Sequence, residues 1–330
     1  MKAITYDTYG SPAVLKLNII PRPQPADDEV LVKVHATTVT SGDRLARSLD
    51  MPAGFGLIGR LVFGIFRPRK AVLGTEFSGE VISTGKNVTR FRQGDKIIAF
   101  PGAGFGGYAE FATIAEDKAI ILKPANLTYV QSAALSFGGG TALNFLRDKG
   151  HIQKGDNILI IGAAGSVGSA AVQLAKHFGA NVTGVCKKSA TDMVKSLGGD
   201  QVIDYSRADF TQNGETYDII LDTSGTATYA RCEGSLKPNG RLLLVSSNLW
   251  QLLRMIFTRK QDGKKGIGGY AAENAEDLKY LSSMAEAGQF LPHIDKTFPL
   301  ELMSDAHAYV QSGHKLGNVV VTVAPDHPNS

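Results

Sequence analysis

The sequence predicts an α/β protein in which a small, irregular, barrel-like β domain is joined to a doubly wound parallel sheet. The first 120 residues contain short strands separated by glycines, whereas apolar strands alternate with helices after Lys123-Pro124. The length of 330 residues fits about two domains. We therefore expect one domain to comprise residues 1–124 and 270–330, and the other to comprise residues 125–269.

The individual elements follow from local patterns. Residues 30–36 alternate partly between apolar and polar side chains and follow the turn-rich run PRPQPADDE, which indicates a strand. Residues 157–161 are almost wholly apolar, as in a strand buried on both faces of a parallel sheet. The other expected strands are residues 79–82, 96–100, 108–111, 182–186, 201–205, 218–222, 241–245 and 319–323. The expected helices are residues 169–178, 191–197, 276–287 and a stretch at 131–149 interrupted by three glycines.

Composition excludes several classes of protein. Hydrophobic residues make up 43% and charged residues 20% of the chain, which excludes a disordered chain. The net charge of +4 is spread along the sequence, so no nucleic-acid partner is expected. No apolar run approaches the length of a membrane-spanning helix. Cys186 and Cys232 form no CxxC pair, and the first ten residues lack an apolar signal region; we therefore expect a reducing compartment, the cytoplasm, and no signal peptide.

A turn rich in small residues lies between the apolar strand at 157–161 and the following helix. It reads Gly162-Ala163-Ala164-Gly165-Ser166-Val167-Gly168. Small residues let the backbone approach a pyrophosphate, whose charge is favoured at the N-terminus of a helix. The alternative is an ordinary tight turn, but the order of strand, turn and helix is the one that dinucleotide binding requires.

The residues after the next strand indicate which dinucleotide binds. An NAD site usually has an acidic residue about 20 positions beyond the glycines, whereas Lys187 and Lys188 stand at this place. A cation would attract the 2′-phosphate of NADPH. Tyr205, which ends the following strand, would add a hydroxyl donor or stack on adenine. Alternatively, both lysines are solvated surface charges.

Several segments together resemble the medium-chain dehydrogenase/reductase superfamily. The segment GTEFSGEV at 74–81, with Gly94-Asp95, is similar to its N-terminal catalytic domain. Thr141-Ala142-Leu143, the glycine turn and the run VIDY at 202–205 are similar to its cofactor domain, and GHKLGNVV at 313–320 to its C-terminal return. The resemblance covers nearly the whole chain and implies a GroES-like β-barrel catalytic domain, a Rossmann-type cofactor domain and a homodimer.

This sequence departs from the zinc-dependent members at the positions that hold catalytic zinc. The matching residues are Thr40, Thr75 (before Glu76) and Phe137, and phenylalanine cannot bind zinc. The cysteine-rich structural lobe is also absent. We therefore expect no metal site, and the chain resembles the zinc-free quinone oxidoreductase and enone reductase branch.

Without zinc, hydride transfer requires an acceptor that spreads the incoming charge. A quinone or an α,β-unsaturated carbonyl does so by conjugation, and a few hydrogen-bond donors then suffice. The sequence therefore predicts an NADPH-dependent oxidoreductase acting on small, hydrophobic, conjugated carbonyls or quinones. The alternatives are an NADPH-binding regulatory or interaction protein with little catalysis, and an alcohol dehydrogenase.

Thr40, Asp43 and Thr75 are the candidate catalytic residues, because they lie where the family places its active site. Asp43 is alternatively a charged residue in the first turn of a helix that begins near Ser41, where the helix dipole favours it. Thr75 would donate a hydrogen bond to the acceptor or only fill space. No residue is an obvious general acid, so solvent would protonate the product.

The predicted cofactor contacts come from several segments. The resemblance places Thr141 near the nicotinamide, although this residue alternatively faces the core from a helix. Thr223 and Ser246 follow two further strands. The resemblance also implies that the loop between Gly313 and Gly317 lies beside the nicotinamide. The full predicted set is Thr141, Ala164, Gly165, Ser166, Val167, Gly168, Lys187, Lys188, Tyr205, Thr223, Ser246, His314, Lys315 and Leu316.

Two apolar stretches resemble insertions. Residues 55–66 precede the basic run Arg67-Pro68-Arg69-Lys70, and residues 249–257 precede Arg259-Lys260. Each would form a lid over a pocket for a bulky acceptor, pack between the domains, or touch a membrane surface as a basic amphipathic segment. Membrane contact is the least expected of the three.

Overall fold

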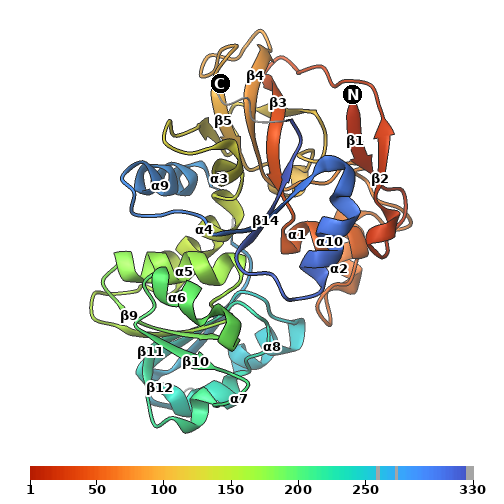
Figure 1. The fold of residues 1–330 in the computed structure, drawn as a ribbon. Coiled ribbons are helices and arrows are strands. Elements are labelled where there is room, and N and C mark those ends of the chain that lie inside the picture. The colour runs from red at the N-terminus through yellow and green to blue at the C-terminus, as the bar shows by residue number, and fades with distance from the viewer. Residues whose placement is uncertain (258–260, 272–273, 325–330) are drawn as a thin grey trace. The chain divides into compact units, whose positions relative to one another are not determined.

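The computed structural model describes residues 1–257, 261–271 and 274–324. It divides the chain into two compact units (Figure 1). The first contains residues 1–51, 56–137 and 273–330, and the second contains residues 52–55 and 138–272. The first boundary thus lies at 137/138 rather than at the expected 124/125, because the segment before it packs on the strands of the first unit.

The first unit is built mainly from antiparallel strands. In its described residues, one sheet has the strand order β14-β15-β3-β4-β5-β7, with β6 also paired to β3, and a second sheet pairs β1 with β2. Among the strands that the structure describes in this unit, only β14 and β15 pair in parallel. The strands are β1 (Lys2–Thr5), β2 (Lys16–Ile19), β3 (Glu29–Thr38), β4 (Phe77–Thr84), β5 (Lys96–Ala99), β6 (Phe111–Ala115), β7 (Ile120–Leu122), β14 (Ile294–Pro299) and β15 (Asn318–Thr322).

Short helices cover this sheet. Helix α3 packs on β3, β4 and β15, and α9 packs on β7. Figure 1 labels α3, α9, β3 and β4. On α3, the ring of Tyr129 stacks on His35 of β3 at 4.1 Å, and Ser78 of β4 donates to the Tyr129 carbonyl. These contacts explain why residues 125–137 belong to the first unit. Its helices are α1 (Ser41–Ser48), α2 (Gly56–Phe63), α3 (Tyr129–Ala133), α9 (Ala275–Glu286) and α10 (Met303–Gln311).

The second unit contains a parallel sheet. Its six described strands have the order β10-β9-β8-β11-β12-β13, which is the order of the doubly wound dinucleotide-binding fold. Buried aliphatic side chains of β8, β11 and β12 form its core. The strands are β8 (Asn157–Ile161), β9 (Asn181–Cys186), β10 (Gln201–Asp204), β11 (Tyr217–Asp222), β12 (Leu236–Leu244) and β13 (Lys265–Gly268). The helices are α5 (Ser166–His177), α6 (Thr191–Ser196), α7 (Tyr229–Cys232) and α8 (Leu249–Phe257).

Two local predictions were wrong. The three glycines do not interrupt the helix: α4 (Ser136–Leu143) runs through them and continues as a π-helical segment, Asn144–Lys149. A side chain at Gly138 would lie 2.7 Å from Ser166 Oγ, so glycine permits close packing of α4 against the start of α5. The strand expected at 108–111 begins only at Phe111, since the Tyr108 carbonyl bonds instead to the Ile4 amide.

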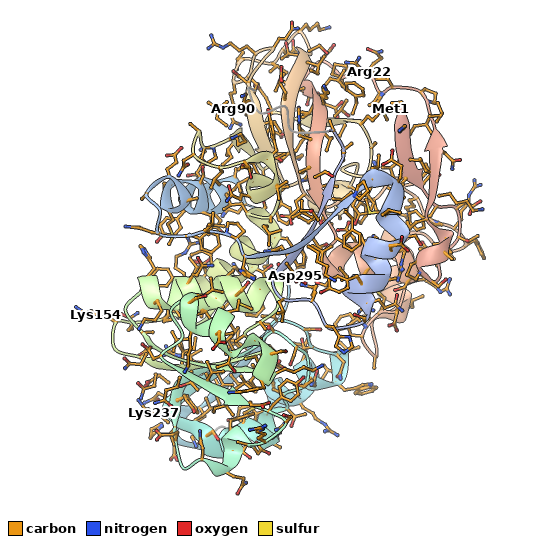
Figure 2. The ribbon with its side chains drawn as sticks, viewed as in Figure 1. Met1, Arg22, Arg90, Lys154, Lys237 and Asp295 are labelled. Carbon is orange, nitrogen blue, oxygen red and sulfur yellow. The ribbon has the colours of Figure 1, made fainter. Side chains whose placement is uncertain are left out.

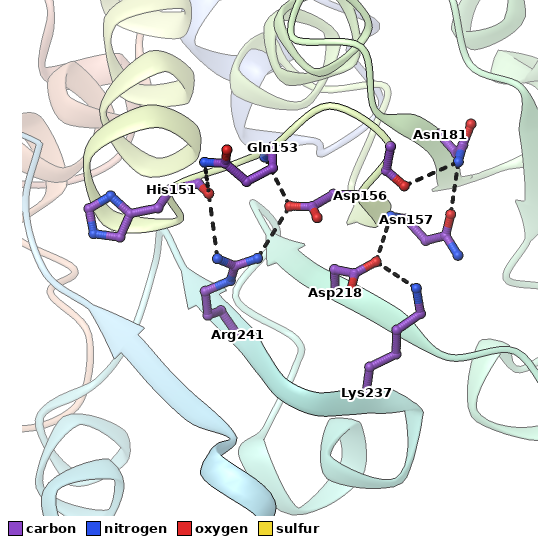
Figure 3. Close-up of polar contacts among 9 residues, drawn as sticks. His151, Gln153, Asp156, Asn157, Asn181, Asp218, Lys237 and Arg241 are labelled. Carbon is purple, nitrogen blue, oxygen red and sulfur yellow. Dashed lines mark hydrogen bonds and ion pairs between the residues drawn. The ribbon is translucent and has the colours of Figure 1, made fainter.

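The amino edge of the parallel sheet is occupied by structural polar contacts (Figure 3). Arg241 pairs with Asp156 at 3.2 Å, and Lys237 pairs with Asp218 at 2.7 Å. Asp218 also accepts the Asn157 amide at 2.8 Å. These pairs connect the strand starts and loops at this edge, so ligand binding is expected at the opposite, carboxyl edge. No described helix has both the length and the apolar character needed to cross a bilayer.

Candidate functional site

The predicted catalytic residues form one hydrogen-bonded cluster in the first unit. Thr40 caps the N-terminus of α1, and its hydroxyl accepts the Asp43 amide at 3.1 Å while donating to Asp43 Oδ2 at 2.7 Å. The Oγ1 atoms of Thr40 and Thr75 lie 3.0 Å apart. The expected helix start near Ser41 is therefore confirmed, and Asp43 occupies its first turn.

Asp43 is the centre of this cluster and is fully buried. Its Oδ1 accepts the amides of Gly74 and Thr75 at 3.0 and 3.1 Å. Its Oδ2 accepts the Thr40 amide at 3.0 Å and both threonine hydroxyls. Burial raises the pKa of Asp43, and the bonds from Thr40, Gly74 and Thr75 oppose that rise. Because Asp43 is fully buried and bonded to both segments, it holds α1 against the 74–75 loop and is not exposed as a base.

The three positions that the resemblance matches to zinc ligands, Thr40, Thr75 and Phe137, meet around Gly42. A β-carbon placed there would lie 3.4 Å from Thr40 Oγ1, 3.6 Å from Thr75 Cγ2 and 3.6 Å from Phe137 Cε2. The structure thus brings together residues that are almost 100 positions apart in the sequence. Their chemistry does not fit zinc, which requires Cys, His or carboxylate ligands at three or four positions. In the described residues, no group of three or more such side chains is placed to hold a metal.

Glu76 is a buried carboxyl that the sequence analysis did not assign a role. Its Oε1 accepts the Thr38 hydroxyl at 2.6 Å, and its Oε2 accepts the Phe137 amide at 2.6 Å. Burial raises the pKa of Glu76 to about 8. These two bonds connect β3 to the start of α4 and position Phe137 beside the threonines.

The second unit places most of the predicted cofactor residues at one edge of its sheet. The glycine turn follows β8, and Lys187 and Tyr205 follow β9 and β10. Asp204 is in register with Cys186 in the parallel pair, so Lys187, Lys188 and Tyr205 emerge side by side. The strands β11 and β12 are followed by Thr223 and, two residues on, Ser246. The ends of parallel strands share one edge, which therefore contains Ala164, Gly165, Ser166, Val167, Gly168, Lys187, Lys188, Tyr205, Thr223 and Ser246.

The glycine turn has the geometry of a pyrophosphate cradle. No side chain caps the N-terminus of α5 at Gly165, and a β-carbon there would meet only the Gly162 carbonyl, at 3.5 Å. A β-carbon at Gly168 would lie 2.1 Å from the same carbonyl, so only glycine allows α5 to pack this closely on β8. An uncapped helix N-terminus with open space beside it suits a dinucleotide phosphate.

Two residues that the sequence analysis undervalued hold the loops around this cradle. The Thr223 hydroxyl donates to the carbonyls of Ile161 and Gly162 at 3.0 and 3.1 Å and so holds the glycine turn; its contact with a cofactor stays a prediction. Buried Asp222 accepts the amides of Ser224, Gly225 and Ala227. The sequence signal for Asp222 was an acidic residue that ends an apolar strand and precedes a Thr-Ser-Gly turn.

The remaining predicted contacts lie on other elements. Thr141 is half-buried on α4, in the second unit. His314 is exposed in the first unit, whereas Lys315 and Leu316 are half-buried. The Leu316 amide and the Tyr309 hydroxyl both donate to Asp295 Oδ2, at 2.9 and 2.8 Å, so Asp295 (Figure 2) fixes this loop. Its place beside a cofactor stays a prediction.

The two insertion-like stretches are both helical. The exposed side chain of Trp250 lies on α8, whose Met255 and Leu252 lie against Gly266 and Gly268 of β13. Helix α2 turns several aliphatic side chains toward solvent. The basic pair Arg259-Lys260 lies outside the described residues.

Comparisons with known proteins agree with this architecture. The alcohol dehydrogenase GroES-like domain family matches residues 26–125, and the zinc-binding dehydrogenase family matches residues 197–321. The chloroplast envelope quinone oxidoreductase homolog of Arabidopsis thaliana is 30% identical, with 97% of this chain and 98% of the relative covered. The chain belongs to the medium-chain dehydrogenase/reductase superfamily. Within this superfamily it groups with the quinone and enone reductase branch.

Two further members of the superfamily are similar over nearly the whole chain. The structure of the quinone oxidoreductase from Coxiella burnetii has a TM-score of 0.86 and 32% identity, and covers 98% of this chain and 99% of its own. The chloroplastic NADPH-dependent alkenal/one oxidoreductase of Arabidopsis thaliana is 30% identical over 98% of this chain and 80% of the relative. The predicted superfamily and fold class are therefore confirmed.

Proposed function

We propose that this protein is a zinc-independent, NADPH-dependent oxidoreductase that reduces quinones or α,β-unsaturated carbonyls. The oxidoreductase assignment follows from its superfamily and from relatives named quinone oxidoreductase and alkenal/one oxidoreductase. The structural observation that best supports this acceptor class is the Thr40, Thr75 and Phe137 cluster. It offers hydroxyl groups where the zinc-dependent members of the family bind a metal.

Hydroxyl donors suit conjugated acceptors better than isolated ketones. An isolated ketone develops a localised alkoxide, which a metal stabilises. A conjugated acceptor spreads the same charge over an enolate or hydroquinone anion, and hydrogen bonds then suffice. Bound NADPH supplies the hydride, and water supplies the proton, so that an enone and NADPH plus one proton give the saturated ketone and NADP⁺.

The hydrogen bonds distinguish the roles of the two threonines. The Thr40 hydroxyl donates a hydrogen bond to Asp43 Oδ2, with 2.7 Å between the oxygens. The Thr75 hydroxyl has only longer alternatives, Asp43 Oδ2 at 3.2 Å and Thr40 Oγ1 at 3.0 Å. Longer hydrogen bonds are weaker, so Thr75 loses less when it turns to an acceptor oxygen. We assign to Thr75 the bond to the developing anion, and to Thr40 and Asp43 the positioning of Thr75.

The carboxyl edge of the second unit supports NADPH as the cofactor. The open N-terminus of α5 suits the pyrophosphate, and the exposed Lys187 and Lys188 suit a 2′-phosphate. Asp204, at the end of β10, lies within the electrostatic influence of Lys188, but hydrogen bonds from Ser206 engage it and hold its pKa below the usual range. We therefore propose that the lysines, rather than Asp204, face the adenosine ribose. Thr141 and the 314–316 loop are proposed to border the nicotinamide.

An acceptor screen tests this function. NADPH oxidation would be measured with quinones, enals, enones and simple aldehydes, before and after chelator treatment, with the zinc content determined separately. We expect turnover of the conjugated acceptors that chelation leaves intact, and little turnover of simple aldehydes. NADPH binding without turnover would favour a regulatory protein, and chelator-sensitive aldehyde reduction would favour an alcohol dehydrogenase.

We also retain the cytoplasmic location and the homodimer as proposals. The free, buried Cys186 and Cys232 support a reducing compartment. Burial raises their thiol pKa values to about 11 and about 12, so neither is poised for redox chemistry. Fractionation of the source cells tests the location, and sedimentation equilibrium tests the assembly.

A further inference from the structure

Helix α2 and the turn after it present an unusual surface. A helix at the surface of a soluble domain normally turns polar side chains to solvent. Here Leu57 is 73% exposed and Phe66 is 94% exposed. The exposed apolar side chains of this segment are Leu57, Ile58, Leu61, Val62, Ile65 and Phe66. We call these six residues the α2 patch.

The α2 patch is held in place from beneath. Phe63 lies on the opposite side of α2 from Leu57 and Leu61, and its ring contacts that of Phe105 in the core at 6.2 Å between centroids. The Tyr9 hydroxyl donates to the Gly64 carbonyl at 2.8 Å, and the Arg69 amide donates to the Phe63 carbonyl at 2.8 Å. The apolar face is therefore a fixed outer surface of the first unit.

Cations accompany the α2 patch. Arg60 lies on the flank of the helix, and Arg67, Arg69 and Lys70 follow it directly; all four are exposed. The sequence contains no acidic residue from position 51 to position 75. The preceding Asp50 pairs with Arg44 at 3.4 Å. An apolar face bordered by uncompensated positive charge is complementary to an anionic, partly apolar surface.

We propose that the α2 patch docks on the surface of an anionic lipid bilayer, with its aliphatic side chains among the lipid headgroups and acyl chains. Apolar burial and attraction to anionic headgroups act together at such an interface. A second copy of this chain fits less well, because a two-fold interface would bring the same cations face to face. This docking does not depend on the proposed function, since vesicle binding is read without catalysis.

Vesicle cosedimentation tests the docking. The full chain would be mixed with vesicles of phosphatidylcholine alone or of phosphatidylcholine with phosphatidylglycerol. We expect binding to the anionic vesicles only, and weakening by salt. The double variant Leu57→Ser, Phe66→Ser should bind more than about tenfold less. The variants Arg67→Ser and Arg69→Ser should each bind the anionic vesicles about fivefold less. If these arginines served only the folding of the first unit, vesicle binding would not change.

Matched changes elsewhere on the first unit serve as controls. Ile19 is 76% exposed on β2, and the side chain of Arg92 is 90% exposed. Ile19→Ser and Arg92→Ser should bind vesicles as the unchanged protein does. The proposal fails if anionic vesicles do not bind the protein, if the α2 and control variants bind equally, or if the patch instead drives self-association that Leu57→Ser abolishes.

Discussion

The hydroxyl oxygens of Thr40 and Thr75 lie 3.0 Å apart, and both bond to the same carboxylate oxygen of Asp43. By the family resemblance, this triangle stands where zinc-dependent members bind their metal, and it offers hydroxyl groups that donate hydrogen bonds. The geometry of the proposed active site therefore depends on the buried carboxyl of Asp43. In our proposal Asp43 and Thr40 position Thr75, and Thr75 binds the acceptor.

Replacing Asp43 by Asn should destabilise the first unit. The carboxylate of Asp43 accepts hydrogen bonds from backbone amides and threonine hydroxyls. In asparagine, an NH₂ group would replace one of its oxygens and face some of these donors, which would leave buried donors without an acceptor. We expect the free energy of unfolding to fall by about 2–4 kcal/mol, as measured by urea denaturation. The matched control is Asp50→Asn, since the Asp50 side chain is 77% exposed and the change should cost less than about 0.5 kcal/mol. Equal effects at both positions would contradict the role given to Asp43.

Thr75→Val should lower kcat with enones about 100-fold, because it removes the donor to the developing anion. Thr75→Ser retains the hydroxyl and should keep most of the activity. Steady-state kinetics with one enone, together with the dissociation constant for NADPH, separate the effect on catalysis from any effect on cofactor binding. Undiminished turnover by the valine variant would remove Thr75 from the mechanism.

Lys187→Glu should raise the Michaelis constant for NADPH about 10- to 100-fold, because a charge-assisted contact to phosphate contributes roughly 1.5–3 kcal/mol. The Michaelis constant for NADH should change much less. The matched control is Lys195→Glu, an exposed lysine on α6 of the same unit, which should alter neither value. If NADPH and NADH respond equally to Lys187→Glu, the lysine does not recognise the 2′-phosphate.

His307 should contribute a loss of stability to the first unit on mild acidification, whereas Glu76, whose pKa burial raises to about 8, contributes in the opposite direction. This histidine is fully buried, its Nε2 lies 3.1 Å from the Tyr108 hydroxyl, and Arg47 adds a nearby positive charge. Burial, with Arg47, lowers the pKa of His307 to about 3. The unfolded chain, with a pKa near 6.5, binds the proton first as the pH falls, so the stabilising contribution is lost from about pH 6.5 downward.

From pH 7 to pH 5 this one group should remove about 2 kcal/mol from the free energy of unfolding. Urea denaturation of the unchanged protein and of His307→Gln at both pH values separates this contribution from that of Glu76. His307→Gln, which keeps a hydrogen-bonding group beside Tyr108, should abolish that part of the pH dependence. The exposed His314 supplies the control, since His314→Gln should retain the slope of the unchanged protein. If His307→Gln leaves the pH dependence of the free energy of unfolding unchanged, His307 is not the group responsible.

Most of the second unit was predictable from the sequence: five of its six described strands were expected, whereas β13, α7 and α8 were not. Its strands are short and apolar, and each is followed by a turn or a helix, so periodicity locates β8 at 157–161 without reference to the rest of the chain. The glycine turn and Lys187 are local signals too, because the chain order of a doubly wound sheet places every strand end at one edge. The error at Gly138 arose because helix propensity alone cannot foresee that α4 packs on Ser166.

The sequence by itself determined the fold class and the superfamily, and it predicts the cofactor edge and the replacement of zinc ligands, because these depend on residue types and on order along the chain. Tertiary structure decided what the side chains at those positions do. It buries Asp43, which holds α1 against the 74–75 loop. It gives Thr40 a shorter hydrogen bond to Asp43 than Thr75 has, and it exposes the α2 patch to solvent. Such outcomes depend on contacts between segments far apart in sequence, and no local pattern encodes the burial or the partners that those contacts create.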